Sequence, residues 1–463
     1  MHASRHSIVG IVTLICVLIA APGALAQERP DLQVLLCTSF DGTVQPDIGT
    51  GVEVTGGEGL EYVEGKAGQA ARFGDDRFVE YRNLPAIDPQ SGTIELWVTP
   101  HFGNRDLADH YYLRLESEDA SSWFDLNFST AACGPRVAIG VGGETFQARA
   151  DFRSVEERPN HLAVTWDTID PDMARLRLYV DGVIAAYADF KPMAAPTVLR
   201  IGRKSATEAT DANADLDELY VYNRALTEMQ VWALHESVDG PEARLAAIRE
   251  LVAHDDGVRA ERMRILREER RVAMVVGRTV SGWQDRMFAD LGMPVADRIN
   301  ESETENTDLS AYDLLIFPGG GSFALSDAGA EALRQFVQAG GGYVGVCAGA
   351  YAAKRYGLIE NEYFQFRERG RCEISLRPHP ITEGFHPRRL LDVRHANGPF
   401  IEVGDPAEAP VLYKAGPPYA CVIARAFGDG RVVIFSAHPE SDAESRPLTR
   451  NAILWAAKVT GVE

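Results

Sequence analysis

The sequence predicts a multidomain protein in which an all-β jelly-roll sandwich is followed by an α/β domain with a doubly wound parallel sheet. Three observations lead to this fold class. The chain of 463 residues is too long for one ordinary hydrophobic core. Residues 32–237 contain short strands of alternating apolar and polar residues, without intervening helices. From residue 271 onward, nearly continuous apolar strands alternate with amphipathic helices.

The strands of the sandwich show a period of two residues. Residues 92–98, 161–166 and 175–180 each alternate between one face and the other. Asp181 and Gly182 follow the third of these strands, and an Asp-Gly pair is typical of a two-residue hairpin turn. Many such strands without helices favour a sandwich or a jelly roll over a parallel sheet.

The segment 238–270 predicts a helical linker packed on a neighbouring domain. Its apolar residues share one helical face, namely Leu245, Ile248, Leu251 and Val252. Arginines and glutamates are interleaved between residues 259 and 270. A basic docking face is one interpretation of these arginines, but the interspersed acids favour a solvated surface.

The remaining chain, residues 271–463, predicts the α/β domain. Its expected elements are strands at 272–277, 312–317 and 342–346, and helices at 283–291 and 327–339, the last capped by Ser326. Apolar strands between amphipathic helices predict a flavodoxin-like parallel sheet that is covered on both faces. Functional groups in such a sheet lie at the carboxyl ends of its strands.

The first 26 residues have the pattern of a signal peptide. An apolar run at 8–21 is followed by Ala24-Leu25-Ala26, which is an A-x-A cleavage site. The run is too short for a permanent membrane span, and no later stretch is long enough. We therefore expect a secreted or periplasmic protein without a transmembrane anchor after cleavage.

Charge and cysteine content limit the classes of partner and the redox state. The formal net charge of −21 argues against a nucleic-acid partner, because two polyanions repel each other. Five cysteines remain after the signal peptide: Cys37, Cys133, Cys347, Cys372 and Cys421. An oxidising compartment would allow two disulfides and one free thiol, with Cys372–Cys421 as one possible pair; five buried thiols are the alternative.

Cys347 lies at a junction between a predicted strand and a predicted helix, within Gly345-Val346-Cys347-Ala348-Gly349. Only small neighbours permit the strained backbone of such a nucleophile elbow. The sulfur would lie near the first N–H groups of the helix, which stabilise a thiolate. An inert buried cysteine is the alternative, but packing alone explains the surrounding small residues poorly.

A base and an oxyanion hole can be assigned from two other strand ends. His438 and Glu440 follow the apolar strand at 432–435, and the carboxylate would hold the imidazole in one tautomer. The N–H groups of Gly320 or Gly321, paired with that of Ala348, would form an oxyanion hole. The alternatives are a surface turn at His438 and a simple tight bend at the glycines.

The sandwich resembles the concanavalin A-like lectin/laminin G-like family. The residues that carry the likeness are Phe40-Asp41-Gly42, residues 68–73, the 92–98 strand, residues 178–182 and residues 216–226. The resemblance implies a calcium site at Asp41 and Asp217, since calcium prefers carboxylate oxygens. The alternative role for these aspartates is to stabilise turns.

The C-terminal part resembles the class I glutamine amidotransferase-like superfamily, and more narrowly the N-terminal domain of biotin-protein ligases. The motifs are Pro318-Gly319-Gly320-Gly321, residues 341–351, Asn397-Gly398-Pro399 and residues 436–440. The resemblance implies that Cys347, His438 and Glu440 are nucleophile, base and orienting acid. It assigns no role to Asn397 or Tyr351. With no ligase half and no synthetase domain in the sequence, we expect neither a biotin ligase nor a complete amidotransferase.

Two functions follow from these observations. The first is a hydrolase that attacks a small amide, peptide or ester through a thioester, while the sandwich binds a glycan or a surface polymer. This chemistry requires no cofactor. A calcium ion at Asp41 and Asp217 would have only a structural role in the sandwich. The second is a non-catalytic carbohydrate- or protein-binding protein, in which the α/β domain is a degenerate scaffold.

Overall fold

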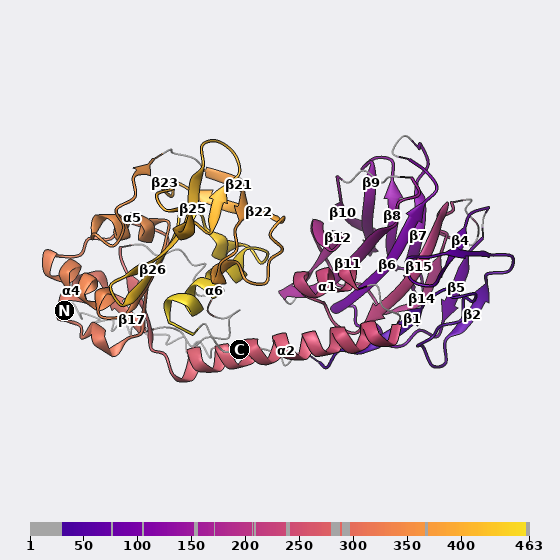
Figure 1. Ribbon diagram of the computed structural model, residues 1–463, viewed down its shortest axis with the longest axis horizontal. Coiled ribbons are helices and arrows are strands. Elements are labelled where there is room, and N and C mark those ends of the chain that lie inside the picture. Colours follow the sequence, from indigo (N-terminus) through magenta and orange to yellow (C-terminus); the bar gives the residue numbers. More distant parts are fainter. Residues whose placement is uncertain are drawn as a thin grey trace, which may run out of the picture.

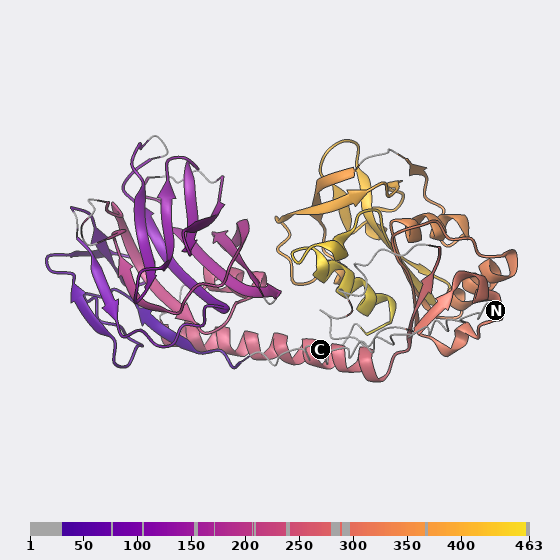
Figure 2. The same ribbon diagram turned by 180° about the vertical axis from the view of Figure 1, so that it is seen from behind.

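The computed structural model describes residues 30–75, 77–103, 106–151, 156–170, 172–205, 207, 210–237, 241–278, 288, 297–365 and 369–459. The predicted signal peptide lies outside this range, as does the helix expected at 283–291, apart from Phe288. Figure 1 shows an N-terminal β-unit beside a C-terminal unit that mixes helices and strands, with a long helix along one edge of both. The same arrangement is visible from behind in Figure 2.

The N-terminal unit is a sandwich of two antiparallel sheets. The first sheet has the order β13-β12-β11-β6-β15-β4-β3, with β1 paired to β15, and the second has the order β10-β9-β8-β7-β14-β5-β2. The strands of the first sheet are β1 Val34–Thr38, β3 Glu61–Glu64, β4 Gln69–Phe73, β6 Ser91–Pro100, β11 Asn160–Asp170, β12 Met173–Val180, β13 Val183–Phe190 and β15 Ala214–Tyr222. Those of the second are β2 Glu53–Gly56, β5 Val79–Arg82, β7 His110–Ser117, β8 Ser122–Ser129, β9 Gly134–Val141, β10 Glu144–Arg149 and β14 Pro196–Ile201.

The hairpin expected at Asp181-Gly182 joins β12 to β13. Val180 pairs with Val183 across the turn, and both turn residues have positive φ, at 48° and 75°. Aspartate and glycine tolerate this conformation, and its twist matches that of the flanking strands. The two-residue connection therefore sets the register of this edge of the sheet.

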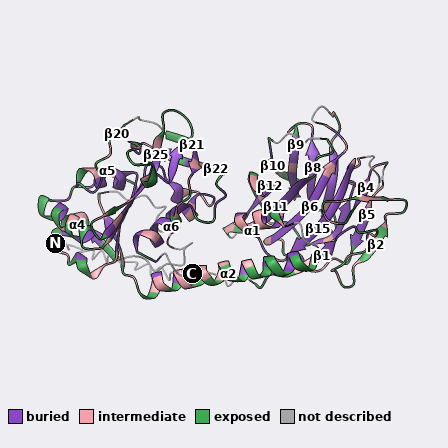
Figure 3. Cartoon of the chain, viewed as in Figure 1, coloured by how far each residue is buried: buried purple, intermediate pink, exposed green. Residues whose placement is uncertain are grey.

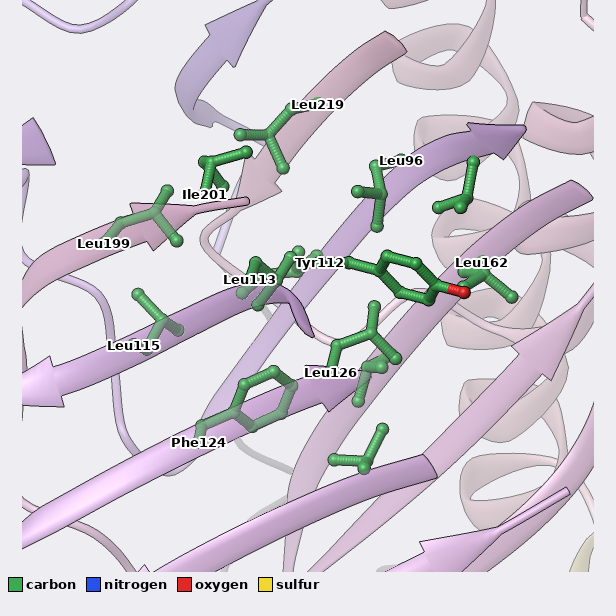
Figure 4. Close-up of a cluster of buried hydrophobic side chains, with 14 of the residues drawn as sticks. Leu96, Tyr112, Leu113, Leu115, Phe124, Leu126, Leu162, Leu199, Ile201 and Leu219 are labelled. Atoms are coloured by element: carbon green, nitrogen blue, oxygen red, sulfur yellow. The ribbon is translucent and has the colours of Figure 1, made fainter. Parts of the chain in front are cut away.

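The core of the sandwich lies between the facing sides of the two sheets. Leu96 and Leu162 come from the first sheet, and Leu113, Phe124 and Leu126 from the second; all five side chains are buried. Figure 4 shows them among the other members of the cluster. Side chains of alternate residues point to the same face of a strand, so the period of two in the sequence produces this buried layer.

Two helices follow the sandwich. Helix α1, Glu228–Glu236, begins at Thr227, whose side chain forms a capping box with Gln230. Helix α2, Pro241–Glu268, is the long helix of Figure 1, and the residues exposed along its outer side are green in Figure 3.

Helix α2 contacts the cores of both units. The face expected from the sequence packs on the sandwich through Leu245, Ile248 and Val252. Further along, Met263 and Leu266 belong to a hydrophobic cluster of the C-terminal unit. Buried Arg244 also donates to Glu95 of β6 at 2.8 Å. The helix is therefore attached to the sandwich at its start and to the C-terminal unit near its end.

A mixed sheet of order β17-β16-β18-β19-β26-β25-β24-β21-β22 organises the C-terminal unit. Its strands are β16 Val272–Val276, β17 Asp297–Asn300, β18 Leu314–Phe317, β19 Gly342–Val346, β21 Arg369–Leu376, β22 Leu390–Ala396, β24 Val411–Tyr413, β25 Tyr419–Phe427 and β26 Gly430–Phe435, with the short strands β20 Tyr363–Phe364 and β23 Phe400–Glu402 beside β25. The helices are α4 Asp327–Gln338, α5 Ala348–Arg355 and α6 Arg446–Ala456, and short 3-10 turns are η1 Glu301–Asn306, η2 Leu309–Ala311, η3 Pro380–Thr382, η4 Pro406–Glu408 and η5 Pro439–Ser441. As expected, Ser326 caps α4 by accepting from the Gly329 N–H at 3.0 Å.

The prediction of a wholly parallel sheet is corrected by this topology. Pairing is parallel from β17 through β16, β18 and β19 to β26, but β21, β22, β24 and β25 pair in antiparallel fashion. The turn between β25 and β26 is only two residues long, Gly428 and Asp429. A parallel pair needs a crossover of a dozen or more residues, so this connection requires an antiparallel hairpin.

All five cysteines of the described region are free thiols, so the possible Cys372–Cys421 disulfide is absent. Cys372 lies on β21 and Cys421 on β25, and β24 runs between these two strands. Strands are about 4.8 Å apart, so two such spacings exceed the roughly 7 Å limit for bridged Cα atoms. The alternative of five buried thiols is also wrong, because Cys133 is exposed and Cys372 is only partly buried.

Within the described part of the chain, no helix is long and apolar enough to cross a membrane.

Candidate active site

Cys347 occupies the junction between β19 and α5. Its backbone has φ 50° and ψ −96°, a strained conformation for a residue with a side chain. The Cys347 N–H donates to the Phe435 carbonyl of neighbouring β26 at 2.8 Å, which anchors the junction to the sheet. Its Sγ lies 3.5 Å from the Ala396 carbonyl, and the residue is 8% exposed. The geometry is that of the elbow expected from the sequence.

Two glycines allow the helix to pack closely behind this elbow. A Cβ on Gly349 would lie 2.1 Å from the Phe317 carbonyl oxygen, and one on Gly345 would lie 2.7 Å from the Gly349 backbone. Both contacts are far too short for any larger residue. Tyr343 strengthens the junction by donating from its hydroxyl to the Gly349 carbonyl at 2.6 Å. The small residues are thus required for close packing and also leave Cys347 at the end of the strand.

His438 and Glu440 lie beyond the end of β26, next to Cys347. The His438 Nδ1 and Glu440 Oε1 atoms are 2.8 Å apart, so the carboxylate can orient the ring. On its other side the ring hydrogen-bonds to the Cys347 side chain. His438 is 3% exposed and Glu440 is 1% exposed. The structure therefore brings all three residues of the predicted triad together.

The electrostatics of the site favour a protonated His438. Burial lowers the pKa of this imidazole, but hydrogen bonds and negative charge from Cys347 and Glu440 outweigh burial and raise the pKa to about 9. An imidazolium near neutral pH can stabilise an adjacent thiolate and can donate a proton to a leaving group.

The Pro-Gly-Gly-Gly turn also reaches the site, and Gly319 is the residue in contact. A Cβ on Gly319 would lie 2.5 Å from His438 Cε1 and 3.6 Å from Cys347 Cβ. Gly320 and Gly321, the predicted oxyanion donors, follow at the same turn, where Gly320 has φ 137°. Ala348 is the first residue of α5, so its N–H has no acceptor within the helix.

The end of β22 also lies beside the site, and this neighbour was not predicted from the sequence. The His438 N–H donates to the Arg394 carbonyl at 2.8 Å, and the next residues of that segment, Ala396 and Asn397, lie beside Cys347 and Tyr351. The Tyr351 hydroxyl donates to the Asn397 carbonyl at 3.3 Å. Asn397 has φ 63°, and its Asn-Gly-Pro context was the available signal.

The predicted calcium ligands lie far from this site, in the sandwich. Asp41 accepts from the Gln69 N–H at 2.6 Å, whereas Asp217 accepts from the N–H groups of Lys66 and Ala67 at 2.7 and 3.1 Å. The two carboxylates therefore hold one loop, which is the turn-stabilising alternative. Burial raises the pKa of Asp217 to about 7.

A calcium ion takes six to eight oxygen ligands. Among the described residues, no group of three or more His, Cys, Asp or Glu side chains could hold a metal ion. Asp217 Oδ1 is nevertheless buried without a hydrogen-bond partner there. Asp41 and Asp217 thus supply one orphan acceptor and only part of a calcium site.

Two family models match separate parts of the chain. Residues 73–232 match the model of the concanavalin A-like lectin/glucanases superfamily. Residues 301–365 match the model of the biotin-protein ligase N-terminal domain. Both resemblances inferred from the sequence are confirmed. The second match includes Cys347 and the glycine turn, whereas His438 and Glu440 lie beyond it.

Solved structures are similar to parts of the chain, at low sequence identity. Domain 4 of AbnA, an extracellular arabinanase from Geobacillus stearothermophilus solved with arabinotriose, is 22% identical over 44% of this chain and 98% of its own, with a TM-score of 0.35. PurLQS from Thermotoga maritima is 14% identical over 40% of this chain and 98% of its own, with a TM-score of 0.34. A putative GMP synthase subunit from Thermoplasma acidophilum is 16% identical over 41% of this chain and 95% of its own, with a TM-score of 0.32. A search of curated proteins found no match.

Proposed function

We propose that the protein is an exported cysteine hydrolase that cleaves a small amide, peptide or ester bond. The observation that carries this proposal is the hydrogen-bonded series Cys347–His438–Glu440 at the carboxyl ends of β19 and β26. The positive φ of Cys347 supports it further, because strained nucleophile positions cluster at active sites. In chain order, the five parallel strands of the mixed sheet are arranged 2-1-3-4-5. This is the strand order of flavodoxin-like folds, and it supports a flavodoxin-like α/β domain over residues 271–463.

The proposed reaction has two stages. The Cys347 thiolate attacks the substrate carbonyl carbon, and His438 donates its proton to the departing amine or alcohol, leaving a thioester. His438 then takes a proton from water, the hydroxide attacks the thioester, and the acid product leaves as the Cys347 thiolate and the protonated His438 are restored. Glu440 keeps the His438 ring oriented throughout. The N–H groups of Ala348 and of Gly320 or Gly321 would stabilise the oxyanion, each by about 3 kcal/mol.

The sandwich is proposed to bind a glycan or surface polymer. The match of residues 73–232 to the lectin/glucanase superfamily supports this role. We propose that the sandwich covers 32–237 and the helical linker 238–270. Export is proposed on the signal-peptide pattern of residues 1–26. N-terminal sequencing of the mature protein tests export directly, and Gln27 as the first residue is the expected result.

Thiol reactivity tests the enzyme proposal. Brief treatment with iodoacetamide near pH 7, followed by peptide mass spectrometry, should label Cys347 faster than exposed Cys133. Exposure alone favours Cys133, so faster labelling of a residue that is 8% exposed requires an activated sulfur. Labelling of Cys347 that is slower than that of Cys133 would contradict the proposal. A Cys347→Ser variant identifies the labelled peptide.

A binding protein without activity is the second candidate. The contact of Cys347 Sγ with the Ala396 carbonyl favours it, because a thiol that donates there is protonated and unreactive. In that case the sandwich carries the function. Glycan-array binding that survives Cys347→Ala, without turnover of any amide or ester, would support this candidate.

A further inference from the structure

The loop that follows His438 is held by many internal hydrogen bonds. The Ser445 hydroxyl donates to the Pro439 carbonyl at 2.7 Å, and the Ser441 hydroxyl donates to the His438 carbonyl at 2.7 Å. Arg446 Nε donates to the Glu440 carbonyl at 3.3 Å. We call residues 438–446 the base loop. Any displacement of its second half would therefore be transmitted to the backbone of His438 and Glu440.

Two acids at the middle of the base loop are bound by arginines of the sandwich. Asp442 accepts from Arg175 Nη1 at 3.0 Å, and Glu444 accepts from Arg177 Nε at 2.7 Å. Both arginines lie on β12, which is far from the base loop in sequence. Burial opposes the charged form of both acids, but the Glu444 N–H and Arg175 lower the pKa of Asp442, and Arg177 and Arg389 lower the pKa of Glu444. Both are therefore carboxylates near neutral pH.

A third arginine completes the contact from the C-terminal unit. Arg389 donates through Nη2 to Glu444 and through Nη1 to Glu228 of α1 at 2.6 Å. Arg389 and Glu444 are 6% and 4% exposed, so these charges are largely removed from water. Removing one member of such a buried ion-pair group leaves an uncompensated charge, which makes the contact sensitive to single substitutions.

The contact between β12 and the base loop is made by charged side chains. Among the described residues, no hydrophobic cluster joins the two sheets of the sandwich to the mixed sheet. Trp232 of α1 packs against His386 of the C-terminal unit, with ring centroids 4.2 Å apart. Arg389 and Glu444 also line two cavities, of about 480 and 980 Å³. Between β12 and the base loop the contacts are these ion pairs, so they determine how the base loop lies against β12.

We propose that Asp442 and Glu444 are positioning residues for His438 and Glu440, and that Arg175 and Arg177 of the sandwich hold them in place. The sandwich thus contributes to the geometry of the candidate active site and not only to targeting. This inference rests on the proposed function for its catalytic meaning, but the geometry of the His438 ring can be measured without any turnover. Loss of the contact should loosen the pairing of His438 with Glu440 and Cys347.

An NMR titration of the His438 ring in the full chain tests this inference. The wild-type ring should titrate near pH 9, in agreement with its two hydrogen-bond partners. In Glu444→Gln and in Arg177→Gln, we expect its pKa to fall by about one unit toward the ordinary value. Arg177→Gln leaves Arg389 bound to Glu444, so it preserves folding better than a change of the buried acid.

The matched control is Arg264→Gln. Arg264 is an exposed arginine of α2, and it pairs with the nearby glutamates Glu261, Glu268 and Glu269. The Arg264→Gln variant should leave the pKa of His438 unchanged. A His438 pKa that is the same in wild type, Glu444→Gln and Arg177→Gln would overturn the inference.

If the proposed hydrolase function is wrong, the alkylation experiment shows it and the NMR titration does not. In that case Cys347 is alkylated no faster than Cys133 in the wild type, whatever the titration of His438 shows. A shift of the His438 pKa in the two variants supports the positioning role even then.

Discussion

Gly319 lies directly against the ring of His438. A Cβ added to Gly319 would be 2.5 Å from Cε1 of that ring, which is closer than a methyl group can approach, and 3.2 Å from Nδ1. The ring is bound to Glu440 through Nδ1 and is almost fully buried, so it has little room to withdraw. The turn after β18 therefore confines the candidate base, in addition to any role of its N–H groups.

Gly319→Ala is predicted to separate His438 from Cys347. The new methyl group must push the ring, and a displacement of about 1 Å can reduce catalysis by about 100-fold. We expect iodoacetamide labelling of Cys347 at pH 7 to slow to the rate of Cys133. Gly370→Ala is the control, because a Cβ there would meet nothing within 4 Å. Unchanged labelling of Cys347 in Gly319→Ala would contradict the prediction, because it would show that the His438 ring can move without losing its contact with Cys347.

His438 is predicted to make stability depend on pH. Its folded-state pKa of about 9 is above the ordinary value of 6.5, so the folded state binds the proton more tightly. The stabilisation is complete below about pH 6.5 and is lost as pH rises through about 9. Urea unfolding of wild type and His438→Gln at several pH values should therefore give a difference in unfolding free energy that shrinks across this window. A difference that does not change with pH would contradict the assignment. His254→Gln, at an exposed histidine of α2, is the control.

Asp217 is predicted to destabilise the fold at neutral pH, whereas His438 stabilises it. Burial raises its pKa from 3.8 to about 7, so its neutral form stabilises the fold below pH 4 and this contribution is lost as pH rises to 7 and beyond. Asp217→Asn keeps an acceptor for the Lys66 and Ala67 N–H groups but carries no charge. The variant should be more stable than wild type at pH 8, as measured by thermal unfolding. Equal melting temperatures at pH 8 would show that the charge is compensated.

Calcium at Asp41 and Asp217 can be tested with the same variant. If the ion binds, calcium chloride at pH 8 should raise the melting temperature of wild type, EDTA should reverse the increase, and Asp217→Asn should not respond. The orphan Oδ1 of Asp217 is the acceptor that would bind the ion. A wild type that does not respond leaves only the loop-holding role for both aspartates.

Gly257→Ala is predicted to stabilise the protein. Gly257 lies in the interior of α2, where a Cβ would meet nothing within 4 Å. Glycine in a helix interior costs about 0.5–1 kcal/mol relative to alanine, so the unfolding free energy should rise by about that amount. Urea denaturation measures the change. Gly182→Ala is the contrasting variant, because φ is 75° and a Cβ would lie 2.8 Å from the Trp232 ring, so it should destabilise.

The features that the sequence predicted well depend on residues close together in the chain. The hairpin at Asp181-Gly182, the cap at Ser326 and the Cys347 junction each follow from local backbone preferences. The antiparallel half of the mixed sheet was missed, because pairing between β21, β24 and β25 depends on long-range packing and leaves no periodic signal.

The candidate site shows the same limit. The Pro-Gly-Gly-Gly motif indicated a close approach of the backbone, but the turn geometry determines that Gly319 meets His438. The ion pairs of Arg175 and Arg177 with the base loop span 267 positions of sequence. Charged residues are frequent on every surface, so their pattern alone could not identify these partners.

Helix α2 acts as a spacer of defined length between the two units. Its 28 residues span about 42 Å at 1.5 Å per residue, and both of its halves are bound to hydrophobic clusters. One residue inserted between Val252 and Met263 would turn one unit by about 100° relative to the other, which β12 and the base loop could not both follow. Natural variation in the length of this helix should therefore come in whole turns, or be accompanied by loss of the arginine and glutamate pairs.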